Sequence, residues 1–274
     1  TAFNLNRRKS MDRAEYGFSC EGAFENIKAS WTSWKNGAFG ASPVKWVIGI
    51  SGGKDSTVAA ALACRIFGND SVVGVSLPCD GQKDMHDVDR VFKTLDIRRI
   101  TVDIGDAARS VFDGIENNAV AVSLDTKINL PARLRMSVLY AVAQSVNGIV
   151  LCTANLTETR LGFATLYGDH AGSYSPLWDY TVSEVVELGR WLGLPRDLVE
   201  KTPADGLQEL SDEEKLGLRY ADADRLIRLD EGDPDLRRAV MKKFRANFFK
   251  EEIVNIPHPT SGLPDFVLEL RTTA

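Results

Sequence analysis

The chain has 274 residues, and its 38 acidic side chains outnumber its 33 Lys and Arg residues, so its formal net charge is −5. Hydrophobic residues make up 44% and charged residues 26% of the chain, which is ordinary for a globular protein and excludes the collagen, coiled-coil, low-complexity and disordered classes. The acidic balance also argues against a general nucleic-acid binder, because such a domain normally carries a basic excess.

No apolar run approaches the roughly 20 residues of a membrane-spanning helix, and we expect no membrane association. The first thirteen residues are rich in Arg and Lys and have no apolar segment after them, so we expect no signal peptide. The four cysteines are far apart in the sequence: Cys20, Cys64, Cys79 and Cys152. They predict neither a disulfide framework nor a zinc site, and free thiols fit the cytoplasmic location that we expect.

From residue 44 onward, short apolar runs alternate with longer segments of helical periodicity. We expect strands over residues 44–50, 71–77, 100–104 and 148–152. We expect helices over residues 56–67, 85–95, 107–117 and 131–146, the last with Pro131 as its first residue. Alternating strands and helices predict an α/β fold, a doubly wound parallel sheet with helices on both faces.

Both ends of the chain lie outside this alternation. We interpret residues 1–43 as a helical extension whose Trp31 and Trp34 pack onto the sheet. Capping boxes are expected where Ser or Thr precedes Glu by three residues, at 181–184 and 211–214, and two further helices are expected over 221–229 and 234–249. We therefore treat 1–274 as one domain, with 44–200 as a nucleotide-binding core and 201–274 as extra C-terminal helices.

The most informative segment is Ser51-Gly-Gly-Lys-Asp-Ser56, which joins the first strand to the following helix. Backbone amides in such a turn, together with the N-terminus of the helix, form a site for a phosphate anion. Gly52 and Gly53 carry no side chain that would keep a phosphate away. A carboxylate repels phosphate, so Asp55 is expected to hold a bridging Mg²⁺. The segment is neither a Walker A motif nor a GxGxxG motif.

This loop resembles the SGGxDS loop of the PP-loop ATP pyrophosphatases, which cleave ATP between its α and β phosphates. The rest of the chain, from about residue 25 to 260, resembles ammonia-dependent NAD⁺ synthetase within that family. The similarity is carried by five motifs in order: Asn129–Met136 with Leu139-Tyr140, Thr153 with Glu158, Tyr167-Gly-Asp169 with Pro176-Leu177, Lys201-Thr-Pro203 with Leu207, and Asp212–Gly217. The resemblance implies an adenine nucleotide alpha-hydrolase-like fold.

The resemblance also implies the site residues. The ATP-binding residues would be Ser51, Gly52, Gly53, Lys54, Asp55, Ser56 and Thr153. The carboxylates of Asp55 and Glu158 would hold Mg²⁺ and, with Lys201, form the catalytic set. Deamido-NAD⁺ would meet Arg133, Tyr140, Asp169 and Lys250. The implied reaction is ATP-dependent amidation of deamido-NAD⁺ by ammonia, through an adenylated nicotinate carboxylate, with release of AMP and pyrophosphate. Loops 154–175 and 203–212 are the candidate lids that exclude water.

Several positions depart from the family pattern. Leu166, Ser173 and Phe249 stand where the substrate side of the family usually carries Lys, Asp and His, and Val182 and Ala204 replace polar residues of the pyrophosphate side. Two alternatives follow: a relative that adenylates and amidates a different carboxylate, and a nucleotide-binding regulator without turnover.

The helix expected over 132–146 is apolar around most of its circumference, so it must be buried in the core or in a subunit interface. The resemblance to homodimeric synthetases favours a homodimer. Because one synthetase domain fills 274 residues, we expect no glutamine-hydrolysing domain and therefore free ammonia as the nitrogen donor.

Overall fold

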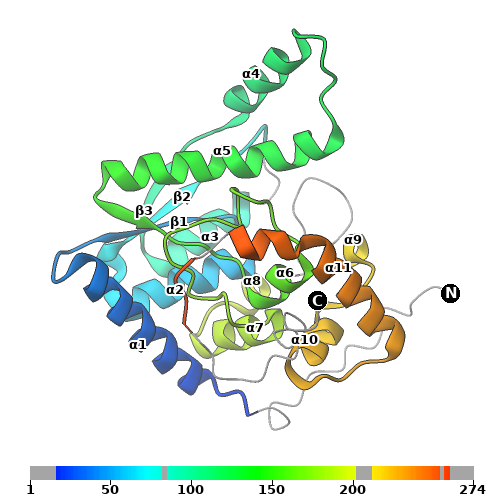
Figure 1. Cartoon of the computed structure of the whole chain (residues 1–274). Helices are drawn as coiled ribbons and strands as arrows, with labels where there is room; N and C mark the ends of the chain where they lie inside the picture. Colours follow the sequence, from blue (N-terminus) through cyan, green and yellow to red (C-terminus); the bar gives the residue numbers. More distant parts are fainter. Residues whose placement is uncertain (1–16, 82–84, 202–211, 254–255, 260–274) are drawn as a thin grey trace.

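The computed structural model describes residues 17–81, 85–201, 212–253 and 256–259 (Figure 1). Its centre is a sheet of four parallel strands in the order β3-β2-β1-β4. The strands are β1 (Lys45–Gly49), β2 (Val72–Ser76), β3 (Arg98–Thr101) and β4 (Gly148–Val150). The chain moves outward from β1 to β3 and then returns to the other side of β1, so the predicted doubly wound sheet is confirmed.

The sheet is buried on both faces because side chains alternate along each strand. On β1, Trp46 and Ile48 pack into one apolar cluster and Val47 packs into another. Val47 pairs in register with Val73 of β2 and Val150 of β4, which belong to the same cluster as Val47. The apolar runs seen in the sequence are therefore those of a parallel sheet covered on both sides.

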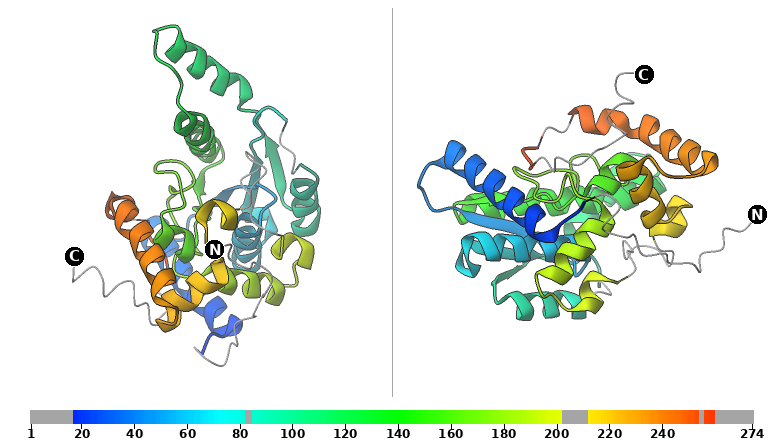
Figure 2. Two further views of the ribbon diagram at one scale, coloured as in Figure 1. Left: turned by 90° about the vertical axis from the view of Figure 1, so that its right-hand side faces the viewer. Right: turned by 90° about the horizontal axis from the view of Figure 1, so that it is seen from below.

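One face of the sheet is covered by five helices, whose buried side chains share a cluster with Trp46 and Ile48. These helices are α1 (Cys20–Phe39), α2 (Lys54–Phe67), α3 (Met85–Leu95), α7 (Val182–Trp191) and α8 (Arg196–Val199). The other face is covered by α5 (Leu124–Ser145), and α4 (Gly105–Glu116) lies against α5. In two views, α4 and the beginning of α5 extend away from the rest of the chain (Figures 1 and 2). A short 3-10 helix covers Asn69–Ser71.

The remaining helices pack beside the carboxyl end of β4. They are α6 (Leu156–Leu161), α9 (Asp212–Leu216), α10 (Tyr220–Leu229) and α11 (Pro234–Ile253). Helix α11 lies along α6, and α10 contacts both α6 and α7. Trp31 of α1 is fully buried against Trp46 and Tyr174, which confirms that the N-terminal helix packs onto the sheet. Among the described residues, no helix is both long and apolar enough to span a membrane.

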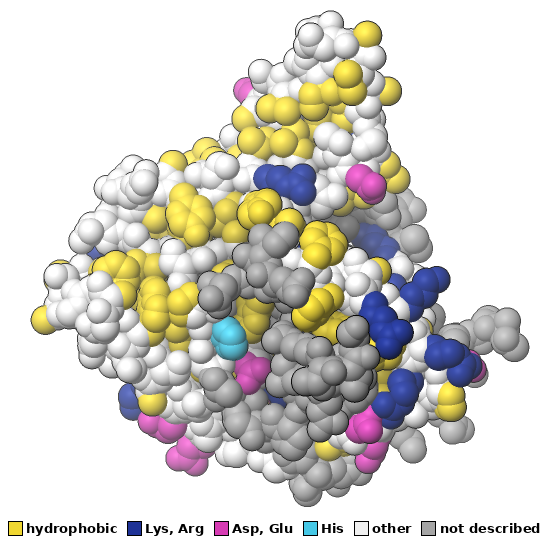
Figure 3. Space-filling model, viewed as in Figure 1, with side chains coloured by type: hydrophobic (Ala, Val, Ile, Leu, Met, Phe, Trp, Pro, Cys, Tyr) yellow, Lys and Arg dark blue, Asp and Glu magenta, His cyan; other side chains and the backbone are white. Residues whose placement is uncertain are grey.

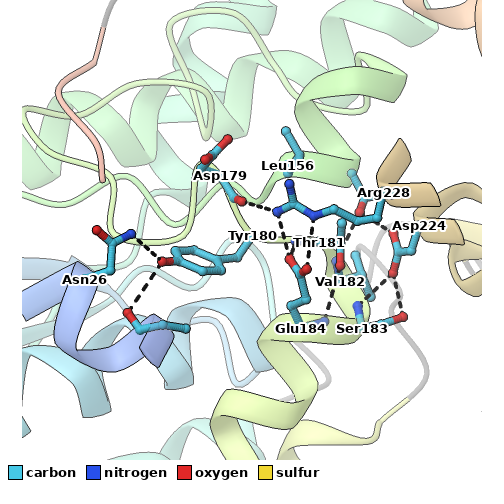
Figure 4. Close-up of polar contacts among 12 residues, drawn as sticks. Asn26, Leu156, Asp179, Tyr180, Thr181, Val182, Ser183, Glu184, Asp224 and Arg228 are labelled. Atoms are coloured by element: carbon cyan, nitrogen blue, oxygen red, sulfur yellow. Dashed lines mark hydrogen bonds and ion pairs between the residues drawn. The ribbon is translucent and has the colours of Figure 1, made fainter. Parts of the chain in front are cut away.

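A buried polar junction joins α6, α7 and α10 (Figure 4). The guanidinium of Arg228 donates from Nε to Oε1 of Glu184 (3.0 Å) and from an NH2 group to Oε2 (2.9 Å), and both side chains are almost fully buried. Asp224, also fully buried, accepts from the amide (2.8 Å) and hydroxyl (2.6 Å) of Ser183 and from the hydroxyl of Thr157. Burial raises the pKa of Asp224 to about 6, against the lowering effect of these hydrogen bonds.

Several element boundaries differ from the sequence prediction, three of them as follows. Helix α5 begins at Leu124 rather than Pro131, because Ser123 caps it by accepting from the amide of Thr126 (3.2 Å), and Pro131 lies inside the helix. Helix α2 begins at Lys54, two residues earlier than predicted. The third strand covers 98–101 instead of 100–104. The capping box of α7 at Thr181 and Glu184 is confirmed, whereas Ser211 of the other predicted box lies outside the described residues.

Candidate active site

The loop between β1 and α2 is held in shape by its own side chains. The hydroxyls of Ser51 and Ser56 lie 3.2 Å apart, and the amide of Gly53 donates to the Ser51 hydroxyl (3.2 Å). The Ser56 hydroxyl also lies within reach of the Gly53 carbonyl (3.2 Å). Gly52 has a φ of 81°, in the left-handed region that residues with a Cβ rarely adopt. The loop therefore needs both the hydroxyls and the glycine to keep this conformation.

Helix α2 begins without a side-chain cap. Its N-cap residue is Gly53, which has no side chain to accept from the first-turn amides, whereas α6 and α7 both begin with full capping boxes. A helix N-terminus presents unpaired N–H groups and the positive end of the helix dipole. This end of α2 is accordingly suited to an anionic ligand such as a phosphate.

Two carboxylates face each other across the carboxyl ends of β1 and β4. Asp55 lies in the first turn of α2, after β1, and Glu158 lies in the first turn of α6, after β4. Asn155 connects them: its Nδ2 donates to Oδ1 of Asp55 (3.0 Å), and its Oδ1 accepts from the amide of Glu158 (3.0 Å). Oε2 of Glu158 accepts in turn from the amide of Asn155 (3.3 Å). Ligands of doubly wound sheets bind where the strand order reverses, and here that place is between β1 and β4.

The charges around this pair suit a divalent cation. The pKa of Glu158 lies well above its ordinary value, first because the half-buried carboxyl loses hydration and second because it faces the charge of Asp55; Lys54 acts in the opposite direction. Lys54 donates to the other oxygen of Asp55 (2.8 Å), and its ammonium lies 5.7 Å from the ring centre of Tyr220. No group of three or more potential metal ligands occurs among the described residues. Mg²⁺ is commonly held by one or two carboxylates together with substrate phosphates, and two carboxylates beside a phosphate loop fit that pattern.

Three of the four predicted substrate residues lie in or against a different segment, the loop of residues 162–170 that follows α6. Nε of Arg133 donates to the carbonyl of Leu166 (3.1 Å). Asp169 accepts from the amide of Thr165 (2.7 Å). The ammonium of Lys250, from α11, donates to the carbonyls of Gly162 and Ala164 (2.9 Å each). Two residues distant in sequence, Arg133 and Lys250, thus hold this loop, while Asp169 bonds within it. We call residues 162–170 the substrate loop.

The other predicted site residues lie in separate surroundings. Thr153 follows β4 and is half-buried, in line with its expected position at the carboxyl end of that strand. Tyr140 lies two turns after Arg133 on α5 and is 39% exposed. Lys201 forms an ion pair with Asp87 of α3 (2.7 Å), and this pairing lowers the pKa of Asp87. The role of each of these residues stays a prediction.

The departures from the family pattern also have distinct positions. Val182 is buried in an apolar cluster that includes Leu161 and Leu226. Leu166 contributes its carbonyl to Arg133, and the amide of Ser173 donates to the carbonyl of Val150 (2.8 Å). The side chain of Phe249 is 49% exposed on α11. Ala204 lies outside the described residues, as does nearly all of the loop over 203–212 that was expected to act as a lid.

Sequence reasoning missed three residues of this region. Asn155 lies between Thr153 and Glu158 in the sequence but received no role, although Asn is a strong N-cap signal before a helix. Tyr167 is 60% exposed and has a φ of 63°, a conformation that the sequence does not reveal. His170 is fully buried and stacks on Trp178 with ring centres 4.8 Å apart. Burial lowers the pKa of His170 to about 4, so its ring is neutral.

Comparisons with known proteins, by sequence and by structure, all match synthetases. A family model described as NAD synthase matches residues 37–256. The NH₃-dependent NAD⁺ synthetase of Pyrococcus furiosus is 39% identical over 184 residues, which cover 66% of this chain and 70% of that protein. The structure of an NMN synthetase from Francisella tularensis matches with a TM-score of 0.78 at 30% identity, over 88% of this chain and 99% of that one. The structure of an NAD⁺ synthetase from Burkholderia pseudomallei matches with a TM-score of 0.70 at 26% identity, over 86% of this chain and 91% of that one.

Proposed function

The chain belongs to the NAD synthase family, and from that premise we propose that it is an ammonia-dependent, AMP-forming amide ligase that converts deamido-NAD⁺ into NAD⁺. The observation that carries this proposal is the meeting of the 51–56 loop with the carboxylates of Asp55 and Glu158 at the reversal point of the sheet. A phosphate loop and a pair of carboxylates are what ATP cleavage between the α and β phosphates requires.

The reaction needs little covalent chemistry from the protein. The nicotinate carboxylate attacks the α-phosphorus of ATP, and pyrophosphate leaves toward the 51–56 loop. Ammonia then attacks the carbonyl carbon of the adenylate; AMP leaves and one proton is lost as the amide forms. The loop amides and the N-terminus of α2 stabilise the charge on the departing pyrophosphate. Positioning of the two substrates supplies most of the remaining acceleration.

The residues present fit a Mg²⁺ ion bound together with ATP. Asp55 and Glu158 would hold it, and its charge would offset that of the phosphates. Lys54, which already pairs with Asp55, would add a second positive charge near the phosphates. The substrate loop, tied to α5 by Arg133 and to α11 by Lys250, would receive the acyl substrate, and Tyr167 at its tip would offer an exposed ring for stacking.

The test is a complete reaction. Purified protein is mixed with ATP, Mg²⁺, ammonium and deamido-NAD⁺, and NAD⁺ and AMP are measured together. The proposal expects one AMP for each NAD⁺ and no NAD⁺ when ATP, ammonium or deamido-NAD⁺ is omitted. ATP binding with no AMP at high protein concentration would instead support the nucleotide-binding regulator.

A second candidate function is favoured by two observations. The NMN synthetase structure matches with a higher TM-score than the NAD⁺ synthetase structure named above, and this chain covers almost all of it. The departures from the family pattern at Leu166, Ser173 and Phe249 also concern positions that the family resemblance assigns to the acyl substrate. The same adenylation and amidation could then act on nicotinate mononucleotide, which lacks the adenylate half of deamido-NAD⁺. Comparing kcat/KM for the two acids under identical conditions decides between them, because the larger value identifies the substrate.

We also propose that the chain forms a homodimer through α4 and α5. These helices extend from the body, and hydrophobic side chains gather over them (Figure 3). The exposed fractions are 39% for Val111, 55% for Val120 and 65% for Leu124. Because exposed apolar patches of this kind mark interfaces, a second copy of the chain is the expected partner. Sedimentation of the wild type and of Leu124→Glu tests this, with a monomeric wild type as the contradicting result. A cytoplasmic location stays a prediction.

A further inference from the structure

Asn155 occupies a unique place between the two carboxylates of the candidate active site. It is fully buried, and its side-chain amide makes two hydrogen bonds in different directions. The oxygen accepts from the amide of Glu158, and the nitrogen donates to the carboxylate of Asp55; both distances are 3.0 Å. The sequence separation between Asn155 and Asp55 is 100 residues, so this contact joins the two halves of the site.

Capping of α6 does not by itself explain an asparagine here. Two other helices of the chain are capped by serine, α1 by Ser19 and α5 by Ser123, and α7 has a full capping box that begins with Thr181. Ser, Thr, Asp and Asn cap helices with similar strength. An amide differs from all the others because its acceptor and its donor are separate atoms. Only this side chain can cap α6 and still donate to Asp55.

The contact has a consequence for the geometry of the pair. Asp55 and Glu158 repel each other when both are charged, and they lie on helices that follow different strands. The Asn155 amide holds Oδ1 of Asp55, while Lys54 holds its other oxygen. Glu158 is held by the capping box, through its Oε2 and the amide of Asn155. One residue therefore contacts both carboxylates: its side chain holds Asp55 and its backbone amide holds Glu158.

We propose that Asn155 is a positioning residue for the divalent cation of the reaction, and that it acts by fixing Asp55 relative to Glu158. The proposal rests on the function proposed above, in which these carboxylates hold the ion. Partners that orient metal ligands commonly change metal affinity by roughly ten- to a hundredfold when they are removed. Asn155 itself contacts no substrate in this mechanism, so its loss changes metal affinity more than the rate at saturating metal.

Two variants separate positioning from capping. Asn155→Ser keeps a cap for α6 but is too short to reach Asp55, whereas Asn155→Ala loses both functions. The probe is Mn²⁺, whose binding to the whole protein is followed by electron paramagnetic resonance in the presence of α,β-methylene-ATP. The positioning role expects both variants to bind Mn²⁺ about tenfold more weakly than the wild type. It also expects the Mg²⁺ concentration at half-maximal rate to rise by a similar factor, with kcat nearly unchanged.

A purely structural role predicts a different pattern. If Asn155 only caps α6, Asn155→Ser binds Mn²⁺ like the wild type and only Asn155→Ala is impaired, and that result would overturn the proposal. Ser19→Ala serves as the matched control, because it removes a cap from α1, away from the carboxylates, and should leave Mn²⁺ affinity unchanged. Failure of the proposed function gives a different result from failure of the positioning role. In that case the wild type itself would bind no Mn²⁺ with the analogue or would form no AMP with either acid.

Discussion

Replacing Asp224 with Asn probes the buried junction that supports the first turn of α6. Oδ1 of Asp224 accepts from the hydroxyl of Thr157, and Oδ2 accepts from the amide and the hydroxyl of Ser183. The Thr157 hydroxyl donates its one proton to Asp224 and accepts from the amide of Val182 (3.0 Å). In Asp224→Asn, an NH₂ group replaces one of the two oxygens, so at least one of these donors loses its acceptor.

The expected cost follows from these contacts. The substitution loses at least one hydrogen bond to a charged group, worth about 1.5–3 kcal/mol, and leaves a buried donor unpaired. Relief from burying the charge offsets part of this loss, so we expect the free energy of unfolding to fall by about 2 kcal/mol near neutral pH. Because Thr157 lies next to Glu158, the Mg²⁺ requirement should rise as well.

The loss of stability in Asp224→Asn should also depend on pH. The pKa of Asp224 is raised to about 6 in the folded state, against about 3.9 in the unfolded chain. The folded protein therefore binds more protons in this interval, and the stability that Asp224 contributes is fully present below about pH 4 and is lost as pH rises through 6. The difference between wild type and Asp224→Asn should be larger at about pH 5 than at about pH 7.5, by roughly 1 kcal/mol.

Urea unfolding followed by far-UV circular dichroism measures both quantities. Asp222→Asn is the matched control, since Asp222 lies on the same helix and pairs with Arg219 (2.6 Å) in a partly exposed position. A pair of this kind contributes less than about 1 kcal/mol. The predicted role of Asp224 is refuted if Asp224→Asn lowers the free energy of unfolding no more than the control, or if its deficit shrinks toward acidic pH.

Three further predictions follow from single contacts. Arg228→Met should lower the free energy of unfolding by about 3–5 kcal/mol in urea titrations, because it leaves the charge of Glu184 buried and unpaired; a loss below 1 kcal/mol would contradict this. Gly162→Ala should cost about 1–3 kcal/mol by the same measurement, since Gly162 has a φ of +67° and an added Cβ would lie 2.0 Å from Cβ of Asn247; a neutral effect would contradict this. Lys250→Met should release the substrate loop and raise KM for the acyl substrate several-fold in steady-state assays, with KM for ATP unchanged; equal effects on both KM values would argue against a local role.

Most of the fold could be predicted from the sequence because its signals are local. Apolar runs bounded by glycine and helical periodicity depend on neighbours a few residues away, and they placed all four strands. The boundary of α5 was wrong because proline is a permissive start signal, whereas Ser123 is a stronger cap. Helix α6 was not predicted because its six residues are too few for a periodic pattern.

For the candidate active site, the 51–56 loop was predicted from its glycine and hydroxyl residues between a strand and a helix, and Glu158 was predicted from the family resemblance; both roles stay predictions. The tertiary structure decided what these residues contact. The amide of Asn155 meets Asp55, and Lys250 meets the carbonyls of a loop more than eighty residues earlier. Such contacts depend on how separate elements pack, and a pattern of neighbouring residues carries no information about which distant backbone will lie beside them.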